Sequence, residues 1–324
     1  MSEPLFMQPV FHEKLWGGDA LKRLYHYPIP SNHTGECWGV SGHPHGLTRV
    51  RNGKFKGQTL ARVWYTHPEI FGNVDTTQRF PILTKILDAH QNLSVQVHPD
   101  NAYAKKHDHD LGKDECWYII AAKPGARLFY GHNARSKSQL VHWIKTGQWK
   151  SLLRTIPVHA GDFIYVPFGM VHALGKGIVA LETQHSSDAT YRFYDFNRID
   201  PTTGKPRRLD IKKSIDMIKV PPVYPELRPL TATVGGGKVT RLVQAAYFNV
   251  SKIKIDHGRC NFNLPNRKFT VLSILHGNGQ IMVDGARYQI KAGDHLVIPG
   301  NTKDWQIFGD HILAIMSTPG PKVL

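Results

Sequence analysis

A seven-residue phrase occurs twice in this chain. Residues 161–167 read Gly-Asp-Phe-Ile-Tyr-Val-Pro, and residues 293–299 read Gly-Asp-His-Leu-Val-Ile-Pro. Glycine and aspartate favour a turn, the mostly apolar residues favour a short buried strand, and proline disfavours further pairing because it has no backbone N–H. A repeated turn and strand of this kind predicts that one β-rich architecture is used twice along the chain.

The rest of the sequence has a similar pattern of short apolar segments and turn residues. Such segments, separated by Gly, Pro, Asn and Asp, occur at residues 93–97, 117–121, 163–166, 270–275, 280–283 and 295–298. They predict a mainly β fold with brief turns. Residues 59–71 and the region after Ser136, where an apolar helical face is interrupted at Gly147, predict a few helices beside the strands.

Prolines mark a boundary late in the chain. Pro221, Pro222, Pro225 and Pro229 remove backbone donors and restrict their neighbours, so regular structure is not expected to pass through them. We therefore predict a first domain with helical insertions at residues 1–220, a proline-rich linker at 221–232 and a second β domain at 233–324. A chain of 324 residues is long enough for two such domains, each with its own core.

Composition narrows the class of protein. Hydrophobic residues make up 41% and charged residues 20% of the chain, as in ordinary globular proteins. No apolar run approaches the roughly 20 residues that cross a bilayer, and the opening residues lack a signal-peptide pattern. The expectation is a cytoplasmic protein without a membrane partner. Cys37, Cys116 and Cys260 are far apart and lack CxxC spacing, which indicates reduced thiols.

The formal net charge of +16 favours an anionic partner. Nucleic acid, an anionic membrane surface and a small phosphorylated substrate all reward an excess of Lys and Arg, so charge alone does not rank them. The basic pairs at residues 105–106, 207–208 and 212–213 are scattered and lack the interleaved aromatics of a single-strand binding surface. We predict no nucleic-acid partner, and the sequence leaves the oligomeric state open.

Four polar residues stand where predicted strands can bring them together. Residues 93–99 alternate as a strand does, so Gln96 and His98 share a face. Glu115 enters another predicted strand, and His172 follows the strand of the first repeated phrase. A closed barrel can direct all four side chains inward. Two imidazoles, a carboxylate and an amide oxygen suit zinc, with other divalent first-row metals as alternatives.

The second repeated phrase lacks this histidine. Five residues beyond the proline, where the first copy has His172, the second has Asp304. A metal site needs several convergent donors, and no such set is apparent near His276, His295 or His311. We therefore predict that the C-terminal domain holds no metal.

The candidate metal ligands also match the sequence pattern of a known family. His98, Glu115 and the glycine-proline phrase that ends in His172 follow the order and spacing of the two motifs of cupin proteins. Over most of its length the chain further resembles the short bacterial form of type I mannose-6-phosphate isomerases. The phrases that carry this resemblance lie at residues 15–18, 35–38, 83–89, 93–100, 112–118 and 187–192. Departures are Cys37, where serine is expected, and Asp304 in the second barrel.

The resemblance implies two cupin (jelly-roll) β-barrels and an enzyme that interconverts D-mannose 6-phosphate and D-fructose 6-phosphate. It also implies one Zn²⁺ per chain and an active-site arginine at Arg192. The residues that it implies as metal ligands are Gln96, His98, Glu115 and His172. None of these five positions is substituted in this chain.

An aldose-ketose isomerisation moves a proton between C2 and C1 through an enediol. It needs an acid/base group and a positive partner for the developing oxyanion. Arg192 is expected to stabilise the enediolate or hold the substrate, because a guanidinium stays protonated. Lys113 is our first choice as proton carrier, with Lys85 and a metal-bound water as alternatives. We also expect Lys85 and Arg198 to bind the substrate, Arg198 through its phosphate.

Two other activities fit the same barrel. A cupin dioxygenase would favour iron and a site open to dioxygen. A noncatalytic sugar-binding cupin would use the pocket as a sensor without turnover. The intact set of four metal donors, together with Arg192, argues against the sensor, whereas metal analysis with an oxygen-uptake assay would separate the dioxygenase from the isomerase.

Overall fold

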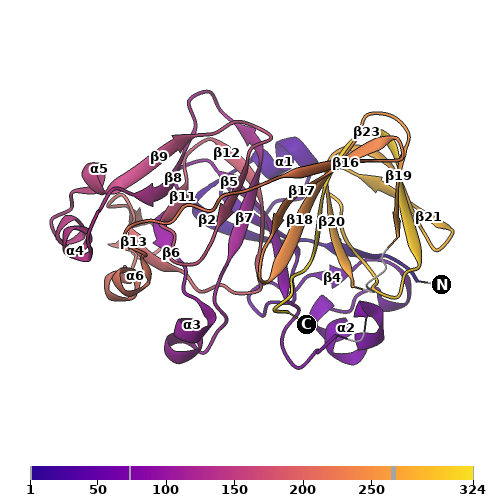
Figure 1. Ribbon diagram of the computed structural model, residues 1–324, viewed down its shortest axis with the longest axis horizontal. Coiled ribbons are helices and arrows are strands. Elements are labelled where there is room, and N and C mark those ends of the chain that lie inside the picture. Colours follow the sequence, from indigo (N-terminus) through magenta and orange to yellow (C-terminus); the bar gives the residue numbers. More distant parts are fainter. Residues whose placement is uncertain (1, 73, 264–267, 324) are drawn as a thin grey trace.

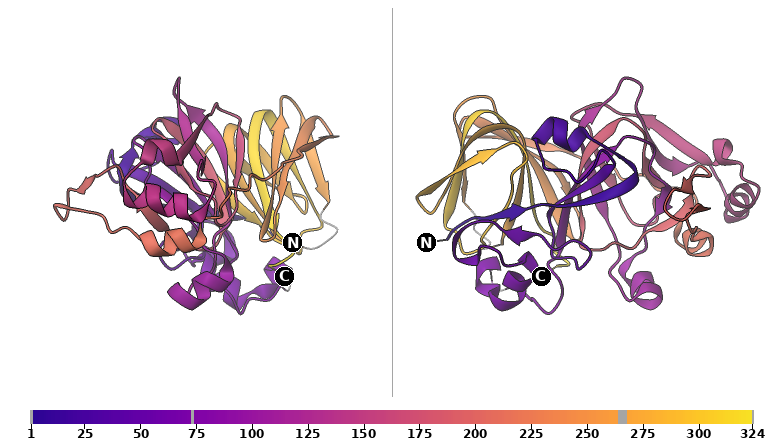
Figure 2. Two further views of the ribbon diagram at one scale, coloured as in Figure 1. Left: turned by 60° about the vertical axis from the view of Figure 1, so that its left-hand side comes forward. Right: turned by 180° about the vertical axis from the view of Figure 1, so that it is seen from behind.

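The computed structural model describes residues 2–72, 74–263 and 268–323. Two β-rich bodies lie side by side, and several helices cover the outer end of the first (Figure 1). The two turned views keep this arrangement (Figure 2). None of the helices in the described ranges is both long and apolar enough to cross a membrane. The predicted mainly β fold of two barrels with a few helices is confirmed.

The first body consists of two antiparallel sheets. The six-stranded sheet has, in spatial order, β10 (Phe163–Val166), β7 (Glu115–Ala122), β12 (Ile178–His185), β5 (Ile82–Ala89), β3 (Thr34–Val40) and β2 (Val10–Gly18). The five-stranded sheet has β13 (Tyr191–Tyr194), β6 (Val95–Val97), β11 (His172–Leu174), β8 (Arg127–His132) and β9 (Leu153–Pro157). Most neighbours are not consecutive in the chain, so residues far apart in sequence meet on one sheet.

The second body is a ten-stranded sheet. Its strands are β16 (Leu230–Val234), β17 (Gly237–Gln244), β18 (Phe248–Ile255), β19 (Arg259–Asn263), β20 (Thr270–Val283), β21 (Ala286–Lys291), β22 (His295–Ile298), β23 (Asp304–Pro319), β1 (Leu5–Gln8) and β4 (Arg49–Val50). A separate small hairpin joins β14 (Ile199–Asp200) to β15 (Lys205–Pro206).

The N-terminal strand lies in the second body, although we assigned it to the first domain from the sequence. Leu5 of β1 pairs with Val297 of β22, and this pairing covers what would otherwise be an exposed strand edge. The end of the predicted linker is also structured, because β16 begins at Leu230. The domain limits 1–220, 221–232 and 233–324 stay a prediction, although β1 and β4 from the first segment pair within the sheet of the second body.

Short helices flank the strands. They are α1 (Ala20–Tyr25), α2 (Leu60–Thr66), α3 (Asn101–Asp108), α4 (Lys137–Lys145), α5 (Trp149–Leu152), α6 (Ile211–Met217) and the 3-10 turns η1 (Gly53–Phe55) and η2 (Pro68–Phe71). Thr59 caps α2 and Ser136 caps α4 by accepting a backbone hydrogen bond. Gly147, in the left-handed region at φ +66°, separates α4 from α5. Both predicted helical regions are therefore confirmed.

One predicted boundary is wrong. Residues 270–275 and 280–283 belong to a single strand, β20, rather than to two. Gly277 adopts φ +80°, and the register against β23 shifts on either side of His276. Such irregularities let a strand bend while its pairing continues. The polar residues between the two apolar segments therefore mark a bend instead of a turn.

The six-stranded sheet separates two cores, and β7 shows how the sequence divides between them. Cys116 and Tyr118 belong to the hydrophobic cluster shared with the second body. Trp117 and Ile119 belong to the cluster of the first body. Because successive side chains of a strand point to opposite faces, Glu115 shares the inner face with Trp117. The carboxylate is thereby placed inside the first barrel.

Candidate metal centre and active site

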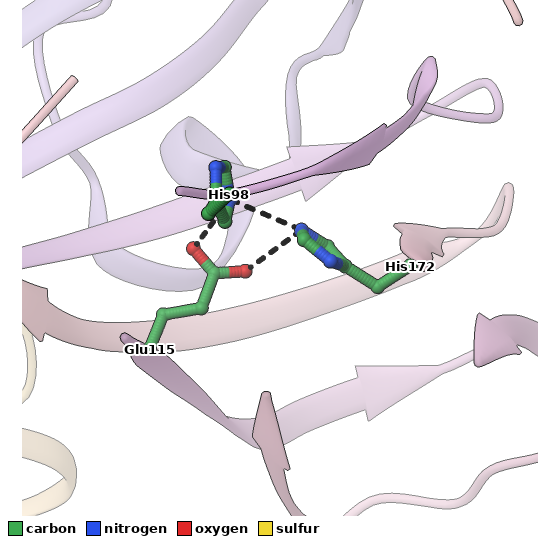
Figure 3. Close-up of side chains that lie close together, drawn as sticks. All are labelled: His98, Glu115 and His172. Atoms are coloured by element: carbon green, nitrogen blue, oxygen red, sulfur yellow. Dashed lines mark hydrogen bonds and ion pairs between the residues drawn. The ribbon is translucent and has the colours of Figure 1, made fainter. Parts of the chain in front are cut away.

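Three buried side chains meet inside the first barrel. The Nε2 atoms of His98 and His172 lie 3.1 Å apart. Glu115 Oε2 is 3.3 Å from His98 Nε2, and Glu115 Oε1 is 3.3 Å from His172 Nε2 (Figure 3). Their candidate ligand atoms all lie within 4.8 Å of one another. The structure therefore brings together three of the four predicted metal ligands.

The facing sheets position this cluster. His98 directly follows β6 and His172 opens β11, two neighbouring strands of the five-stranded sheet. Glu115 opens β7 in the six-stranded sheet. The rings of Trp117 and His172 lie 5.5 Å apart across the barrel, so the inner faces of the two sheets are in contact. Each sheet supplies part of the cluster.

Backbone carbonyls orient both histidines. His98 Nδ1 lies 2.8 Å from the Ala189 carbonyl oxygen, and His172 Nδ1 lies 2.8 Å from that of Met170. A carbonyl only accepts, so each Nδ1 carries the proton and each Nε2 presents its lone pair to the cluster. This is the arrangement that second-shell partners impose on metal-binding histidines.

The protonation states also suit a cation. Burial, followed by the charge of Lys113, lowers the pKa of His98 to about 3, which keeps its imidazole neutral. Burial alone would raise the pKa of Glu115, but Lys113, His98 and His172 outweigh it and hold that pKa well below its usual range. Neutral imidazole and ionised carboxylate are the forms that bind metal.

Glu115 provides the test of whether these residues fit a metal. Both carboxylate oxygens are buried, and among the described residues neither has a hydrogen-bond partner beyond the Lys113 ammonium, which lies 2.5 Å from Oε2. An ionised carboxylate buried in this way is costly unless a cation or donors satisfy it. Two nitrogen lone pairs and this carboxylate converge on one point, which fits a divalent ion such as zinc.

Gln96, the fourth predicted ligand, lies next to the cluster. It stands directly opposite His172 in the pairing of β6 with β11 and opposite Arg192 in the pairing of β6 with β13. Directly paired residues point to the same face of a sheet. Arg192, Gln96 and His172 therefore form a row on one face. Arg192 Nε donates to Ser94 Oγ at 3.0 Å.

Lys113 contacts the cluster directly. Its Nζ lies 2.5 Å from Glu115 Oε2, 3.3 Å from His98 Nε2 and 3.6 Å from Glu182 Oε1. Burial alone would lower the pKa of Lys113, but the charges of Glu115 and Glu182 outweigh it and raise that pKa. Lys113 is thus held as a buried ammonium beside the candidate metal ligands.

Lys85 belongs to a row on the six-stranded sheet. Trp38, Lys85, Glu182 and Trp117 are paired across β3, β5, β12 and β7, so their side chains share the inner face. Lys85 Nζ lies 3.7 Å from Glu182 Oε1 and 4.0 Å from Asp188 Oδ1. It also lies 4.5 Å from the centre of the Trp38 ring. Lys85 is therefore part of the same buried charge network as the cluster.

Glu182 and Asp188 were missed by our sequence reasoning, which gave neither a role. Glu182 lies between the two lysines and accepts from Trp117 Nε1 at 2.9 Å. Burial, followed by the charge of Glu115, raises its pKa. The available signal was a carboxylate directly after the apolar residues 178–181, since a charge inside a buried strand requires partners. Asp188 also pairs with His45 Nδ1 at 3.0 Å.

Arg198 lies in a different charge group. It forms an ion pair with Asp195, which Arg207 also contacts at 2.7 Å. Within the described ranges, no hydrogen bond or ion pair joins Arg198 to the metal cluster. Arg198, Arg207, Lys14 and His33 line a cavity of about 680 Å³. Glu13 and Asp200 line it as well, so the cavity has a mixed charged lining in which the basic residues outnumber the acidic ones.

The second body has a different arrangement at the equivalent positions. Asp304 is exposed at the start of β23. His295 is fully buried, with Nδ1 2.8 Å from Ser273 Oγ and Nε2 3.2 Å from the Tyr27 hydroxyl. Both ring nitrogens thus have protein partners. The absence of a metal from the C-terminal domain stays a prediction.

A buried set of candidate metal donors inside a two-barrel, mainly β chain is typical of cupin metalloenzymes. Residues 5–124 match the model of the type I phosphomannose isomerase catalytic domain, and residues 238–319 match that of the mannose-6-phosphate isomerase cupin domain. The mannose-6-phosphate isomerase of Streptococcus mutans is 47% identical over 310 residues, which is 96% of each chain. The chain therefore belongs to the mannose-6-phosphate isomerase family, as its sequence motifs predicted.

Solved structures agree with this membership. The crystal structure of the mannose 6-phosphate isomerase from Bacillus subtilis superposes with a TM-score of 0.93 at 44% identity, covering 98% of this chain and 99% of the other. A zinc-bound mannose 6-phosphate isomerase has a TM-score of 0.78 at 15% identity, covering 97% of this chain and 99% of the other. At that identity the second comparison shows a shared fold.

Proposed function

We propose that this chain interconverts D-mannose 6-phosphate and D-fructose 6-phosphate by metal-assisted proton transfer through an enediol. The observation that carries the proposal is the buried cluster of His98, Glu115 and His172 with the Lys113 ammonium 2.5 Å from Glu115. A binding protein or sensor does not need a buried acid/base group beside its metal ligands. An acid/base isomerase requires one.

We assign one Zn²⁺ per chain to Gln96, His98, Glu115 and His172. Their mixed nitrogen and oxygen donors suit zinc, and other divalent first-row ions remain alternatives. When bound, such an ion would act as a Lewis acid on the sugar oxygens.

The chain's own residues divide the remaining tasks. Lys113 carries the proton between C2 and C1 as the neutral amine, and Glu182, 3.6 Å from its Nζ and with a pKa raised by burial, takes up the ammonium proton beforehand. Arg192 stabilises the negative charge that develops on the enediolate, because its permanent charge lies in the same row as Gln96 and His172. The barrel wall excludes water from this exchange, since the cluster is buried.

We assign substrate binding to Lys85 and Arg198. Lys85 lies inside the network that contains Asp188 and Glu182. Arg198 lines the cavity of about 680 Å³, which a chain of contacts links to Lys85. Lys14 lies 3.3 Å from Glu36, Glu36 accepts from Trp38 at 2.7 Å, and Lys85 Nζ lies 4.5 Å from the centre of the Trp38 ring. A net charge of +16 attracts an anionic phosphosugar. We further propose a cytoplasmic location and no nucleic-acid partner.

Substitution of Lys113 tests the acid/base assignment. Lys113→Met removes the ammonium while keeping most of the side-chain volume, and we expect kcat to fall by about 10²- to 10⁴-fold. Zinc content should stay at the wild-type level. Lys85→Met should raise KM more than it lowers kcat. A coupled assay for fructose 6-phosphate measures both variants.

The control is Lys150→Met, because Lys150 is exposed on α5. It should leave both kinetic constants at their wild-type values. A wild-type kcat in Lys113→Met would refute the role of Lys113. A larger loss of kcat in Lys85→Met than in Lys113→Met would transfer that role to Lys85.

A further inference from the structure

A tyrosine of the second body reaches the segment that carries Lys113. Tyr247 lies in the turn between β17 and β18, where Ala245 N–H donates to the Phe248 carbonyl at 2.9 Å. The Tyr247 carbonyl accepts from Gly320 N–H at 3.0 Å. The backbone that presents this side chain is therefore held by the turn and by the C-terminal segment.

Tyr247 contacts two elements of the first body. Its ring stacks on His185 at the end of β12, with ring centroids 4.2 Å apart and planes 5° from parallel. Its hydroxyl accepts from Asn101 Nδ2 at 3.0 Å, and Asn101 opens α3. The packing of the two bodies thus includes a polar and aromatic contact in addition to the shared hydrophobic cluster.

Both partners of Tyr247 hold the backbone of Gly112. Asn101 Oδ1 accepts from Gly112 N–H at 2.7 Å, and His185 Nδ1 lies 3.0 Å from the Gly112 carbonyl oxygen. Burial lowers the pKa of His185 to about 4, so the ring is neutral near pH 7 and its Nδ1–H donates to that carbonyl. A Cβ on Gly112 would lie 2.4 Å from the Asn101 backbone nitrogen, which leaves the segment little freedom to shift.

Gly112 directly precedes Lys113. The Lys113 N–H donates to the Pro99 carbonyl at 3.0 Å, and its Nζ lies 2.5 Å from Glu115 Oε2. We infer that Tyr247 is a positioning residue through which the second body holds Lys113 against the metal cluster. This inference rests on the proposed proton-transfer role of Lys113. It gives the C-terminal barrel a part in the reaction without a metal of its own.

Two substitutions of Tyr247 should lower kcat to different extents. Tyr247→Leu removes the stack and the hydroxyl, and it should lower kcat by about tenfold, within the roughly 10²-fold that a 1 Å misplacement can cost. KM and zinc content should stay within about twofold of wild type, because the predicted ligands and substrate-binding residues are untouched. Tyr247→Phe keeps the stack and should retain more of kcat. Tyr288→Leu, on β21 of the same body, is the control and should leave kcat unchanged.

A double-mutant cycle and hydrogen exchange test whether Tyr247 acts through Lys113. In the Lys113→Met background, Tyr247→Leu should cause no further loss of kcat, because both substitutions act through one group. Amide exchange of residues 109–116 should be faster in Tyr247→Leu than in wild type or Tyr288→Leu. Unchanged exchange with unchanged kcat would overturn the inference, and so would effects on kcat that simply add. A wild-type kcat in Lys113→Met alone would instead refute the proposed role of Lys113.

Discussion

Replacement of His98 or His172 by alanine is expected to release the metal and abolish most isomerase activity. Each imidazole Nε2 presents its lone pair to the cluster, so each substitution removes one of the nitrogen ligands that would share the ion with the Glu115 carboxylate. Loss of an outer-shell partner commonly lowers metal affinity or activity by about 10- to 100-fold, so loss of a ligand should exceed that range. Elemental analysis and the fructose 6-phosphate assay on the same preparations measure both effects.

The control for this pair is His142→Ala. His142 is an exposed residue on α4, so its removal should change neither zinc content nor turnover. Thermal unfolding of all three variants separates metal loss from failure to fold, since a folded His98→Ala protein without zinc meets the prediction. Wild-type zinc content in folded His98→Ala or His172→Ala would exclude that histidine as a ligand.

Arg192→Ala is expected to keep the metal and lose turnover. The described hydrogen bonds of the guanidinium go to Ser94 Oγ and to the Arg208 carbonyl, so no candidate metal ligand depends on it. Removal of a preorganised charge next to a developing oxyanion commonly costs about 10²- to 10³-fold in kcat. Arg192→Lys should recover part of the loss, because it restores the charge without the planar fork of donors.

The matched control is Arg62→Ala, on the exposed face of α2. It should behave as wild type in both zinc content and kcat. If Arg192→Ala lost as much zinc as His98→Ala, then the assignment of metal binding to His98 and of charge stabilisation to Arg192 would be wrong. A kcat of Arg192→Ala within about threefold of wild type would show that Arg192 does not stabilise the transition state.

Local signals made much of the fold and three members of the cluster predictable. The strands at residues 163–166 and 295–298 end where the sequence pattern ends them, because glycine-aspartate turns and prolines set both limits. Thr59 and Ser136 mark helix starts through side-chain caps. His98, Glu115 and His172 each stand at or next to the end of a strand, where a short motif is sufficient to place them.

Residues whose roles depend on strand order were harder to predict. Lys85 and Trp117, two partners of Glu182, lie on β5 and β7, and the sequence alone does not say that these strands flank β12. The pairing of Leu5 with Val297 joins opposite ends of the chain. Arg198 has the charge expected of a phosphate-binding residue, but whether Asp195 neutralises it depends on side-chain geometry.

Zinc titration of metal-stripped protein tests the central claim most directly. The protein is freed of metal with a chelator, zinc is added back in steps, and formation of fructose 6-phosphate from mannose 6-phosphate is followed at each step. We expect no turnover without metal, a linear rise with added zinc and saturation at one ion per chain, because one set of four donors holds the reaction centre. Full turnover in protein shown by elemental analysis to contain no metal, or saturation only at two ions per chain, would contradict it.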